Sequence, residues 1–513
     1  MLLHQFFDDA AARLPHKTAL ICGEARFTYA DLAQRIDVIA QLLIDRGVNR
    51  GDRVALFLDN GPEMVCSIYA ALRVGAVFMP INALTKHDKL AYLLNDARAS
   101  VLITHGVLAG FWQHACNANT TVHSCIVVEP PAGMDVTSGR FLPYPTGTAI
   151  KARNVTVQAL IDQDLAAIIY TSGSTGDPKG VMLTHLNMVS AVRSVSTYLA
   201  LREEDVILCV LPLAFDYGLY QLLMSVKVGA TLVLEASFAF PIKVLELMVR
   251  EDVTVFPGVP TMFSLLMNMN DLGRFDLGAL RMITNTAAAL SEEHIRRLRA
   301  LFPRATLFSM YGLTECKRVT YLPPEQLDIR PTSVGRGMPN EEVWLVDESG
   351  ARLPNGSTGE LVIRGSNVMR GYWEKPVETA ERLKPGPIKG EMLLYSGDIF
   401  RTDEEGWLYF VARRDDIIKS RGEKVSPREV ENAIYSLAGV VDAAVVGIHD
   451  DLLGEAVKAF VVVKDGVTLA EREVIRHCLG RLESFMVPKH VEFVAELPKT
   501  DTGKIKKSGL RGS

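Results

Sequence analysis

Two series of short apolar runs, each alternating with helical patterns, constrain the fold of this chain more than any other feature. Over residues 53–105, runs of strand length (VALFL, VFMPIN, SVLITH) alternate with amphipathic stretches, and a second series begins at residue 165. This alternation is typical of β-α-β units and a parallel sheet. The segments ALRVGAVFMP and SVKVGATLVL repeat one helix-to-strand junction. The sequence therefore predicts two similar stacked α/β sheets.

The pattern changes after residue 334 to short alternating strands with Gly and Pro turns, which predicts a small β-rich subdomain over about 334–414. Further on, SPRE at 426–429 is typical of a capped helix start. A chain of 513 residues is also too long for one core. We therefore predict an α/β fold with an N-terminal domain over 1–414 and a small, mobile α+β C-terminal domain over 415–513.

The composition limits the classes of partner. A net charge of −5 and a sequence pI near 6.2 provide no basic surface for nucleic acid. No apolar run reaches membrane-spanning length. The seven cysteines include no Cys-x-x-Cys pair, which favours a reducing compartment and argues against a structural metal. We expect a cytoplasmic protein whose partners are small molecules or another protein.

The stretch YTSGSTGDPKGVMLTH at 170–185 is rich in glycine and hydroxyl residues. Its flanks predict a strand-to-helix loop. Glycines there, Gly180 included, let backbone N–H groups close around phosphate oxygens. A Walker A loop is excluded because Asp-Pro-Lys-Gly follows Gly176, and a surface turn is the alternative. The predicted phosphate-binding residues are Thr171, Ser172, Gly173, Ser174, Thr175, Gly176 and Lys179.

Two further motifs carry groups suited to a nucleotide. YGLTE at 311–315 closes a strand of the second series, where ligands of open parallel sheets bind. Tyr311 can stack on a base, Thr314 can donate to a phosphate, and Glu315 can hold Mg²⁺. SGD at 396–398 predicts a turn where the Asp398 carboxylate accepts from two vicinal hydroxyls. Core packing of Tyr311 and an ordinary Gly-Asp turn are the alternatives.

These motifs resemble, in order over essentially the whole chain, those of the AMP-forming adenylating enzymes: acyl-CoA synthetases, firefly luciferase and nonribosomal-peptide adenylation domains. The resemblance implies that ATP and Mg²⁺ are the cofactors, that a carboxylate is adenylated with release of pyrophosphate, and that the acyl group then passes to a thiol. It implies a ribose-binding Asp398 and a ribose or phosphate contact at Arg413. It also implies a hinge at Asp415, a thiol tunnel near Gly422 and, in PKTDTGK at 498–504, a catalytic Lys504.

Phe215-Asp216 resembles the pair in amino-acid-activating domains whose aspartate binds the substrate ammonium, and a buried carboxylate needs a cation. A helix cap is the alternative role of Asp216. The chain looks most like free-standing amino-acid ligases, such as the prolyl-activating enzymes of secondary metabolism, that load a phosphopantetheine carrier protein in trans. Alignment to these nonribosomal-type domains implies that the substrate is also lined by Tyr217, Tyr220, Pro257, Ile283, Asn285, Met310 and Val319.

Two other functions remain open: an AMP-forming acyl-CoA ligase for a fatty or aryl acid, and a nucleotide-binding module without turnover. The chain also departs from its relatives, with Asp177 in the glycine stretch, Thr286-Ala-Ala near the adenine, and Cys316-Lys-Arg318 after Glu315. We interpret the basic pair Lys317 and Arg318 as a surface feature. A phosphopantetheine phosphate or an acidic substrate is the alternative contact for that pair.

Overall fold

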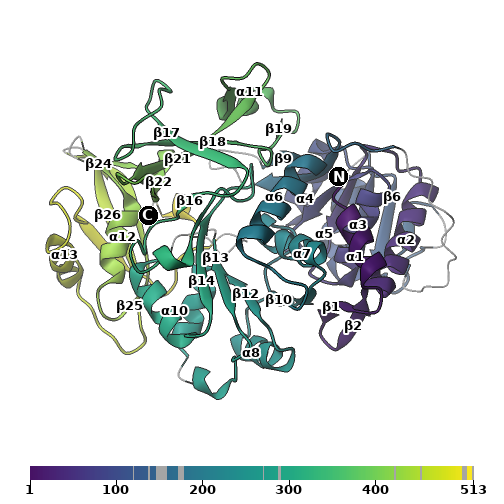
Figure 1. Cartoon of the computed structure of the whole chain (residues 1–513), viewed down its shortest axis with the longest axis horizontal. Coiled ribbons are helices and arrows are strands. Elements are labelled where there is room, and N and C mark those ends of the chain that lie inside the picture. Colours follow the sequence, from purple (N-terminus) through teal and green to yellow (C-terminus); the bar gives the residue numbers. More distant parts are fainter. Residues whose placement is uncertain are drawn as a thin grey trace.

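The computed structural model describes residues 1–118, 121–136, 139–145, 159–171, 178–269, 271–286, 290–420, 423–450, 453–499 and 505–510. Two large sheets, each with its helices, form the purple-to-teal part of the molecule, and a green β-rich region and a yellow C-terminal region adjoin them (Figure 1). This is the predicted α/β fold.

The first large sheet has the strand order β19-β9-β8-β4-β3-β5-β6-β7. Its strands are β3 (Arg53–Phe57), β4 (Val77–Ile81), β5 (Val101–His105), β6 (Ser124–Val128), β7 (Phe141–Pro143), β8 (Leu165–Thr171), β9 (Lys179–Thr184) and β19 (Gly371–Tyr372). Strand β8 pairs in parallel with β4. The prediction that the second series begins at residue 165 is therefore wrong, because long-range pairing places β8 in the sheet of the first series.

The second large sheet has the order β16-β15-β14-β13-β12-β10-β11-β1-β2. Its strands are β1 (Thr18–Cys22), β2 (Ala25–Thr28), β10 (Val206–Cys209), β11 (Thr231–Leu234), β12 (Val255–Gly258), β13 (Met282–Asn285), β14 (Thr306–Tyr311), β15 (Thr320–Leu322) and β16 (Arg336–Gly337). The helices of the two layers are α1 (Gln5–Arg13), α2 (Tyr29–Asp45), α3 (Pro62–Arg73), α4 (His87–Asp96), α5 (Ala109–Asn117), α6 (His185–Tyr198), α7 (Asp216–Val228), α8 (Pro241–Arg250), α9 (Pro260–Met267) and α10 (Glu292–Leu301).

The repeated junction has the same backbone form in both sheets. Gly75 after α3 and Gly229 after α7 both have φ +78°, where a side chain would be strained. Strand β4 then returns parallel to β3, and β11 returns parallel to β10. The structure confirms the prediction of two similar sheets.

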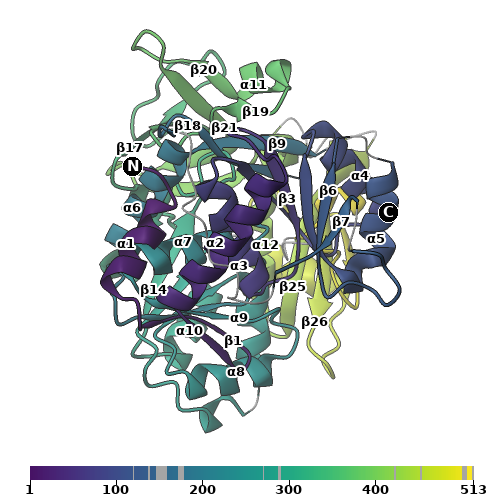
Figure 2. The same ribbon diagram turned by 90° about the vertical axis from the view of Figure 1, so that its right-hand side faces the viewer.

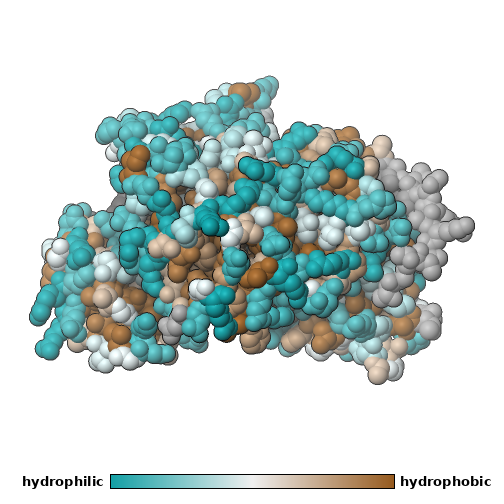
Figure 3. Space-filling view, turned by 60° about the horizontal axis from the view of Figure 1, so that its bottom comes forward, coloured by the Kyte–Doolittle hydropathy of each residue, from teal (hydrophilic) through white to brown (hydrophobic). Residues whose placement is uncertain are grey.

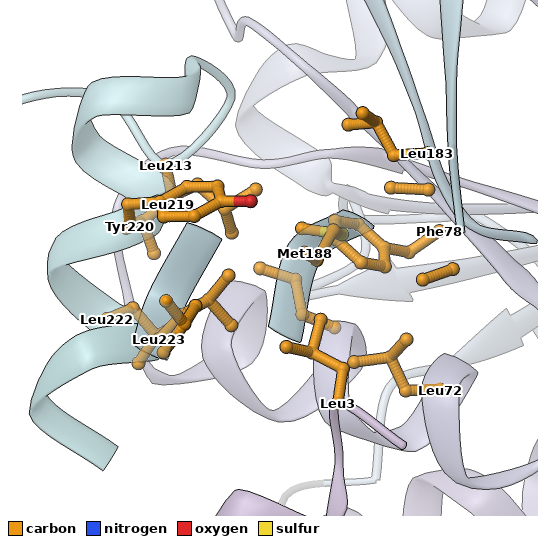
Figure 4. Packing of buried hydrophobic residues seen from close by; sticks show 14 of the residues in the cluster. Leu3, Leu72, Phe78, Leu183, Met188, Leu213, Leu219, Tyr220, Leu222 and Leu223 are labelled. Atoms are coloured by element: carbon orange, nitrogen blue, oxygen red, sulfur yellow. The ribbon is translucent and has the colours of Figure 1, made fainter. Parts of the chain in front are cut away.

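The main core lies between the two sheets. It combines buried residues of α2, α3, α6 and α7 with strand residues of both sheets. In Figure 4, Leu72 of α3, Phe78 of β4, Met188 of α6 and Leu219 of α7 lie around this shared core. In α3 every residue from Met64 to Leu72 is buried. A helix that is apolar on all sides needs cover on all sides, so these helices form a middle layer.

Two smaller units complete the chain (Figure 2). The β-rich unit contains β17 (Glu341–Val346), β18 (Thr358–Gly365), β20 (Leu383–Pro385), β21 (Met392–Thr402) and β22 (Leu408–Arg413), with α11 (Pro376–Arg382) nearby. The C-terminal unit contains β23 (Ile418–Ser420), β24 (Glu423–Val425), β25 (Val440–Asp450), β26 (Gly454–Val463) and β27 (His490–Phe493), with α12 (Pro427–Tyr435) and α13 (Glu471–Leu479).

The C-terminal unit rests against the large domain at α12. Ser426 accepts from the Glu429 N–H as the N-cap of α12, and its hydroxyl donates to the Val411 carbonyl at 2.6 Å. The rings of His294 on α10 and Tyr435 on α12 meet edge to face, 5.5 Å apart. The domain limits at 334, 414 and 415 and the mobility of this unit stay predictions.

The surface gives no further guide to partners. In the described part of the chain, none of the helices combines the length and the apolar character needed to cross a bilayer. On the face shown in Figure 3, hydrophobic residues occur in small groups among hydrophilic ones. Scattered exposed apolar residues of this kind are normal for a globular protein.

Candidate active site

The glycine stretch joins two antiparallel strands. Thr171 ends β8 and Lys179 begins β9, and the two residues pair across the hairpin. Helix α6 starts only at His185, with Thr184 as its N-cap. The predicted strand-to-helix loop is therefore wrong, because a short strand forms before the helix. The remaining predicted phosphate-binding residues lie outside the described residues: Ser172, Gly173, Ser174, Thr175 and Gly176.

Gly180 serves packing within β9. A Cβ at Gly180 would lie 2.7 Å from Ile168 Cγ2 and 3.1 Å from the Tyr170 ring. Ile168 is fully buried and Tyr170 is half-buried, so a residue without Cβ allows the close approach of β8. Its predicted part in the phosphate cradle stays a prediction.

Tyr372 on β19 connects the glycine stretch to Glu315. The Lys179 Nζ lies 5.5 Å from the centroid of the Tyr372 ring, and the Tyr372 hydroxyl donates to Glu315 Oε1 at 2.7 Å. The Met369 N–H also donates to the Glu315 carbonyl at 2.7 Å. A carboxylate oxygen and a lysine ammonium that both lie against Tyr372 suit Mg²⁺ bound to phosphates, so the residues fit the predicted metal and nucleotide.

Tyr311 and Asp398 also meet. The Tyr311 hydroxyl donates to Asp398 Oδ2 at 2.5 Å, and its ring lies edge-on to Phe400 at 4.8 Å. The predicted turn at Asp398 is wrong: the residue lies within β21, at a bulge. Ile399 pairs with Glu360 and Tyr395 pairs with Val362, so three residues face one on β18. A bulge re-aims a side chain without ending the strand.

Burial raises the pKa of Asp398, and Arg413 and the Tyr311 hydroxyl only partly oppose this rise. A carboxyl group whose pKa is higher in the folded than in the unfolded state stabilises the fold at pH values below its unfolded pKa. This stabilisation is lost as the pH rises through the folded pKa. The variant Asp398→Asn is therefore expected to have a higher Tm than the parent at pH 7, with the difference vanishing below about pH 4. Thermal unfolding measured from pH 4 to 8 tests this, with Asp59→Asn as an exposed control. A lower Tm of Asp398→Asn than of the parent at pH 7 would contradict the prediction.

The remaining nucleotide and hinge residues are only partly described. Arg413 ends β22 opposite Asp398, and its Nε lies 4.0 Å from Asp398 Oδ1. Thr314 lies in the turn after β14. Asp415 lies in the short helix Arg414–Asp416. Gly422 and Lys504 lie outside the described residues.

Asp216 is the first residue of α7. The N-cap is Phe215, and no side-chain bond caps the helix there. The hypothesis that Asp216 caps the helix is not supported by this geometry, although a carboxylate in the first turn is favoured by the helix dipole. Asp216 is half-buried, so the prediction of a buried carboxylate is wrong. Its charge acts on the Lys317 ammonium and partly opposes the lowering of the Lys317 pKa by burial.

Lys317 and Arg318 are buried, with 1% and 3% of their surfaces exposed. Their interpretation as a surface feature is wrong. The Lys317 Nζ lies 5.6 Å from the Tyr220 ring centroid, and the Arg318 Cζ lies 4.6 Å from the Tyr217 ring centroid. Burial lowers the pKa of Lys317 to about 8, while Asp216 and Glu315 oppose this shift. Sequence composition could not reveal this placement, since charged residues are usually exposed.

The residues predicted to line the substrate are all buried but belong to two packing clusters. Tyr220, Met310 and Val319 pack between the two sheets, whereas Tyr217 and Ile283 pack under the outer helices.

In Figure 4 the Tyr220 hydroxyl points away from α7 toward Met188. The Tyr217 hydroxyl contacts Thr284 at 2.8 Å. Pro257 and Asn285 lie on the paired strands β12 and β13. Ile283 is thus separated from Tyr220 by the sheet.

Two surface hollows lie elsewhere. One of about 310 Å³ is bordered by Trp344, Arg352 and Leu408, and one of about 550 Å³ is bordered by Arg299, Phe302 and Leu327. Neither includes a predicted site residue.

Comparison with known proteins decides the family. Residues 7–373 match the family described as AMP-binding enzyme, and residues 429–504 match the AMP-binding enzyme C-terminal domain. The chain belongs to the AMP-binding enzymes. The predicted membership of the AMP-forming adenylating superfamily is confirmed.

Relatives of this AMP-binding enzyme match it over nearly its whole length. A long-chain-fatty-acid–CoA ligase of Bacillus subtilis is 32% identical over 98% of this chain and 93% of its own. A feruloyl-CoA synthase of an Amycolatopsis species is 34% identical over 97% and 96%. The crystal structure of ATP-bound MatB from Rhodopseudomonas palustris has a TM-score of 0.88 at 30% identity, covering 100% of this chain and 99% of that chain.

These findings confirm the coarser predictions. The AMP-binding enzyme is an ATP-dependent adenylating enzyme of the acid–thiol ligase superfamily, and ATP with Mg²⁺ are its cofactors. The Bacillus and Amycolatopsis relatives carry the names of acyl-CoA ligases rather than of amino-acid carrier-protein ligases. Their names favour the alternative function over the amino-acid hypothesis.

Proposed function

We propose that this enzyme is an AMP-forming acyl-CoA ligase that activates an organic acid and transfers it to the thiol of coenzyme A. The carboxylate oxygen attacks the α-phosphorus of ATP, the bond to pyrophosphate breaks, and an acyl adenylate forms. The thiolate sulfur then attacks the acyl carbon and displaces AMP, while the thiol proton passes to solvent. The main support is the contact chain in which Tyr372 lies against both Lys179 and Glu315.

Each predicted residue has a role in this proposal. Glu315 holds Mg²⁺, Lys179 and the glycine stretch bind the terminal phosphates, and Thr314 donates to the α-phosphate. Asp398 binds the ribose hydroxyls, Tyr311 packs on the base, and Arg413 contacts ribose or phosphate. Lys504 stabilises the charge on the reacting carboxylate and α-phosphate. Rotation at Asp415 then exposes a thiol path near Gly422.

The amino-acid hypothesis loses its main physical ground at Asp216. That hypothesis rests on a buried carboxylate that needs a cation from the substrate. Asp216 is only half-buried, so water reaches its carboxylate, and its charge also acts on the Lys317 ammonium. A carboxylate that keeps part of its hydration does not need a cation from the substrate.

The proposal is tested by acid-dependent pyrophosphate exchange and by thioester formation with free CoA. We expect both with fatty, aryl or other organic acids and neither with free amino acids. Exchange with proline or another amino acid, with loading of a phosphopantetheine carrier protein and none of CoA, would instead support the amino-acid hypothesis. ATP binding without AMP release with any acid would support a module without turnover.

The variant Asp216→Asn separates the two substrate hypotheses. If Asp216 only balances Lys317, the variant is expected to keep its rate with the preferred organic acid and to lose a few degrees of Tm. If Asp216 binds a substrate ammonium, the loss in kcat/KM is about 10²–10³-fold, since breaking a buried ion pair costs about 3–5 kcal/mol. Steady-state kinetics with the preferred acid distinguish these results.

A further inference from the structure

Arg318 is a buried cation without an anionic partner among the described residues. Only 3% of its surface is exposed, and its Nε has no hydrogen-bond partner there either. Its NH1 donates to the Lys317 carbonyl at 3.0 Å. No carboxylate oxygen in the described part of the chain lies within 4.0 Å of its guanidinium nitrogens. Since arginine does not lose its proton in proteins, the charge stays.

The Arg318 guanidinium contacts aromatic rings and forms no ion pair with the described residues. The buried carboxyl of Glu341 lies nearby, since Asn367 Nδ2 donates to Glu341 Oε1 at 3.1 Å and to the Arg318 carbonyl at 3.2 Å, but burial raises the pKa of Glu341 well above its usual value. The Arg318 guanidinium lies over the Tyr217 ring, and its charge also acts on the hydroxyls of Tyr198 and Tyr220. A ring face attracts a cation only modestly. Moving a full charge out of water costs more free energy than such a contact provides, unless an anion also binds the charge.

The carboxylates of Asp216 and Glu315 contact other groups. The Asp216 charge acts on the Lys317 ammonium, and the Glu315 carboxylate accepts from the Tyr372 hydroxyl, whose ring lies against Lys179. In the described part of the chain neither carboxylate forms an ion pair with Arg318, so the Arg318 charge has no direct partner there.

The backbone holds this arginine inward. Lys317 adopts φ +74°, which is uncommon for a side chain other than glycine. The Lys317 N–H closes the turn by donating to the Leu313 carbonyl at 2.7 Å. Asn367 Nδ2 also donates to the carbonyls of Cys316 and Arg318. A Cβ at Gly312 would lie 2.3 Å from the Lys317 carbonyl oxygen, so the turn also needs that glycine. Such a constrained backbone is typical of functional sites.

The position of Arg318 relates it to the reacting end of the substrate. It follows Glu315 by three residues, so the two Cα atoms lie within roughly 11 Å. It also contacts Tyr217 and precedes Val319, both predicted to line the substrate. A compact acid with its reacting carboxylate near Thr314 and Glu315 would reach Arg318 with its other end.

We propose that the substrate carries a second anionic group, a carboxylate a short distance from the one that is activated, and that Arg318 binds it. Its guanidinium can donate to both oxygens of that carboxylate, which is the strongest form of this contact. Lys317, the preceding residue, adds positive potential. This inference rests on the proposed acid–thiol ligase function and names its substrate class.

Matched acids test the proposal in the unmodified enzyme. Each of the monoacids propanoate, butanoate and pentanoate is compared with the diacid of the same carbon number, and benzoate is compared with a benzenedicarboxylate. The monomethyl ester of butanedioate serves as the counterpart in which the second carboxylate carries no charge. We expect kcat/KM in pyrophosphate exchange to favour at least one diacid over its monoacid and its ester by about 100-fold or more. Butanedioate is also expected to raise the Tm more than butanoate does. Equal or better exchange with every monoacid would overturn the inference.

The variant Arg318→Met tests the assigned residue. We expect it to lose about 100-fold or more in kcat/KM for the preferred diacid, while the rate with the matched monoacid is unchanged or higher. Arg318→Lys should recover part of the loss. Arg352→Met is the control, because Arg352 also stacks on an aromatic ring, that of Trp344, but is exposed and forms an ion pair with Glu342. Equal losses for the diacid and the monoacid would show a structural role and overturn the assignment.

The two proposals fail in different ways. If monoacids support exchange and thioester formation as well as diacids do, the ligase function stands and only the second carboxylate is wrong. If no acid of either kind supports exchange while ATP still binds, the ligase function itself is wrong. The panel with the unmodified enzyme makes this distinction even if a variant at the buried Arg318 does not fold.

Discussion

The variant Glu315→Gln is expected to lower acid-dependent pyrophosphate exchange by about 10²–10³-fold, as for the loss of one preorganised charge contact at a reacting phosphate. A glutamine oxygen can still accept from the Tyr372 hydroxyl, which now donates at 2.7 Å, so the turn should keep its shape. The lost feature is the negative charge that holds Mg²⁺.

Exchange rates measured over a range of Mg²⁺ concentrations check this result. We expect the variant to need more Mg²⁺ and to recover only partly at saturation, with the exposed Glu325→Gln behaving as the parent does. An unchanged rate at low Mg²⁺ would remove Glu315 from the metal site. Tyr372→Phe should have a smaller effect, because that change removes only the hydrogen bond that orients the carboxylate.

The variant Lys504→Ala is expected to lower adenylate formation by about 10²–10³-fold and to leave the thiol step intact. The lysine would stabilise charge that develops on the carboxylate and the α-phosphate, and in the proposed cycle it is withdrawn before the thiol enters. Both half-reactions therefore need separate measurement.

Pyrophosphate exchange reports the first half-reaction, and CoA thioester formation from a synthetic acyl adenylate reports the second. Lys506→Ala is the matched control, since Lys506 lies two residues further along the same tail. Equal losses in both half-reactions would indicate that Lys504 supports the fold of the tail rather than adenylation.

Local sequence patterns predicted part of the fold. The junctions at Gly75 and Gly229 repeat in sequence and have the same φ of +78° in the structure, because a tight helix-to-strand return needs a residue without Cβ. Strand-length and helix-length periods likewise identified most elements of both sheets. The hairpin of β8 and β9 was missed since β9 directly follows the glycine stretch and leads without a break into α6.

The sequence predicted residues of the candidate site but not the contacts between them. The contact of Tyr311 with Asp398 joins residues 87 positions apart, and Tyr372 with Glu315 joins residues 57 apart. Motif order indicated Tyr311, Asp398 and Glu315, but nothing local to GYW at 371–373 marks Tyr372 as their neighbour. A two-residue strand has too short a pattern to predict its partner.

By itself the sequence determined the elements, the two-sheet plan and the nucleotide motifs, because helix and strand periods, glycine turns and short signatures depend on residues close together in the chain. Only the tertiary structure decided that Lys317 and Arg318 lie inside the molecule, where Arg318 forms no ion pair among the described residues. Burial of a charge depends on what distant strands and helices place around it, and that information is not present in any single stretch of sequence.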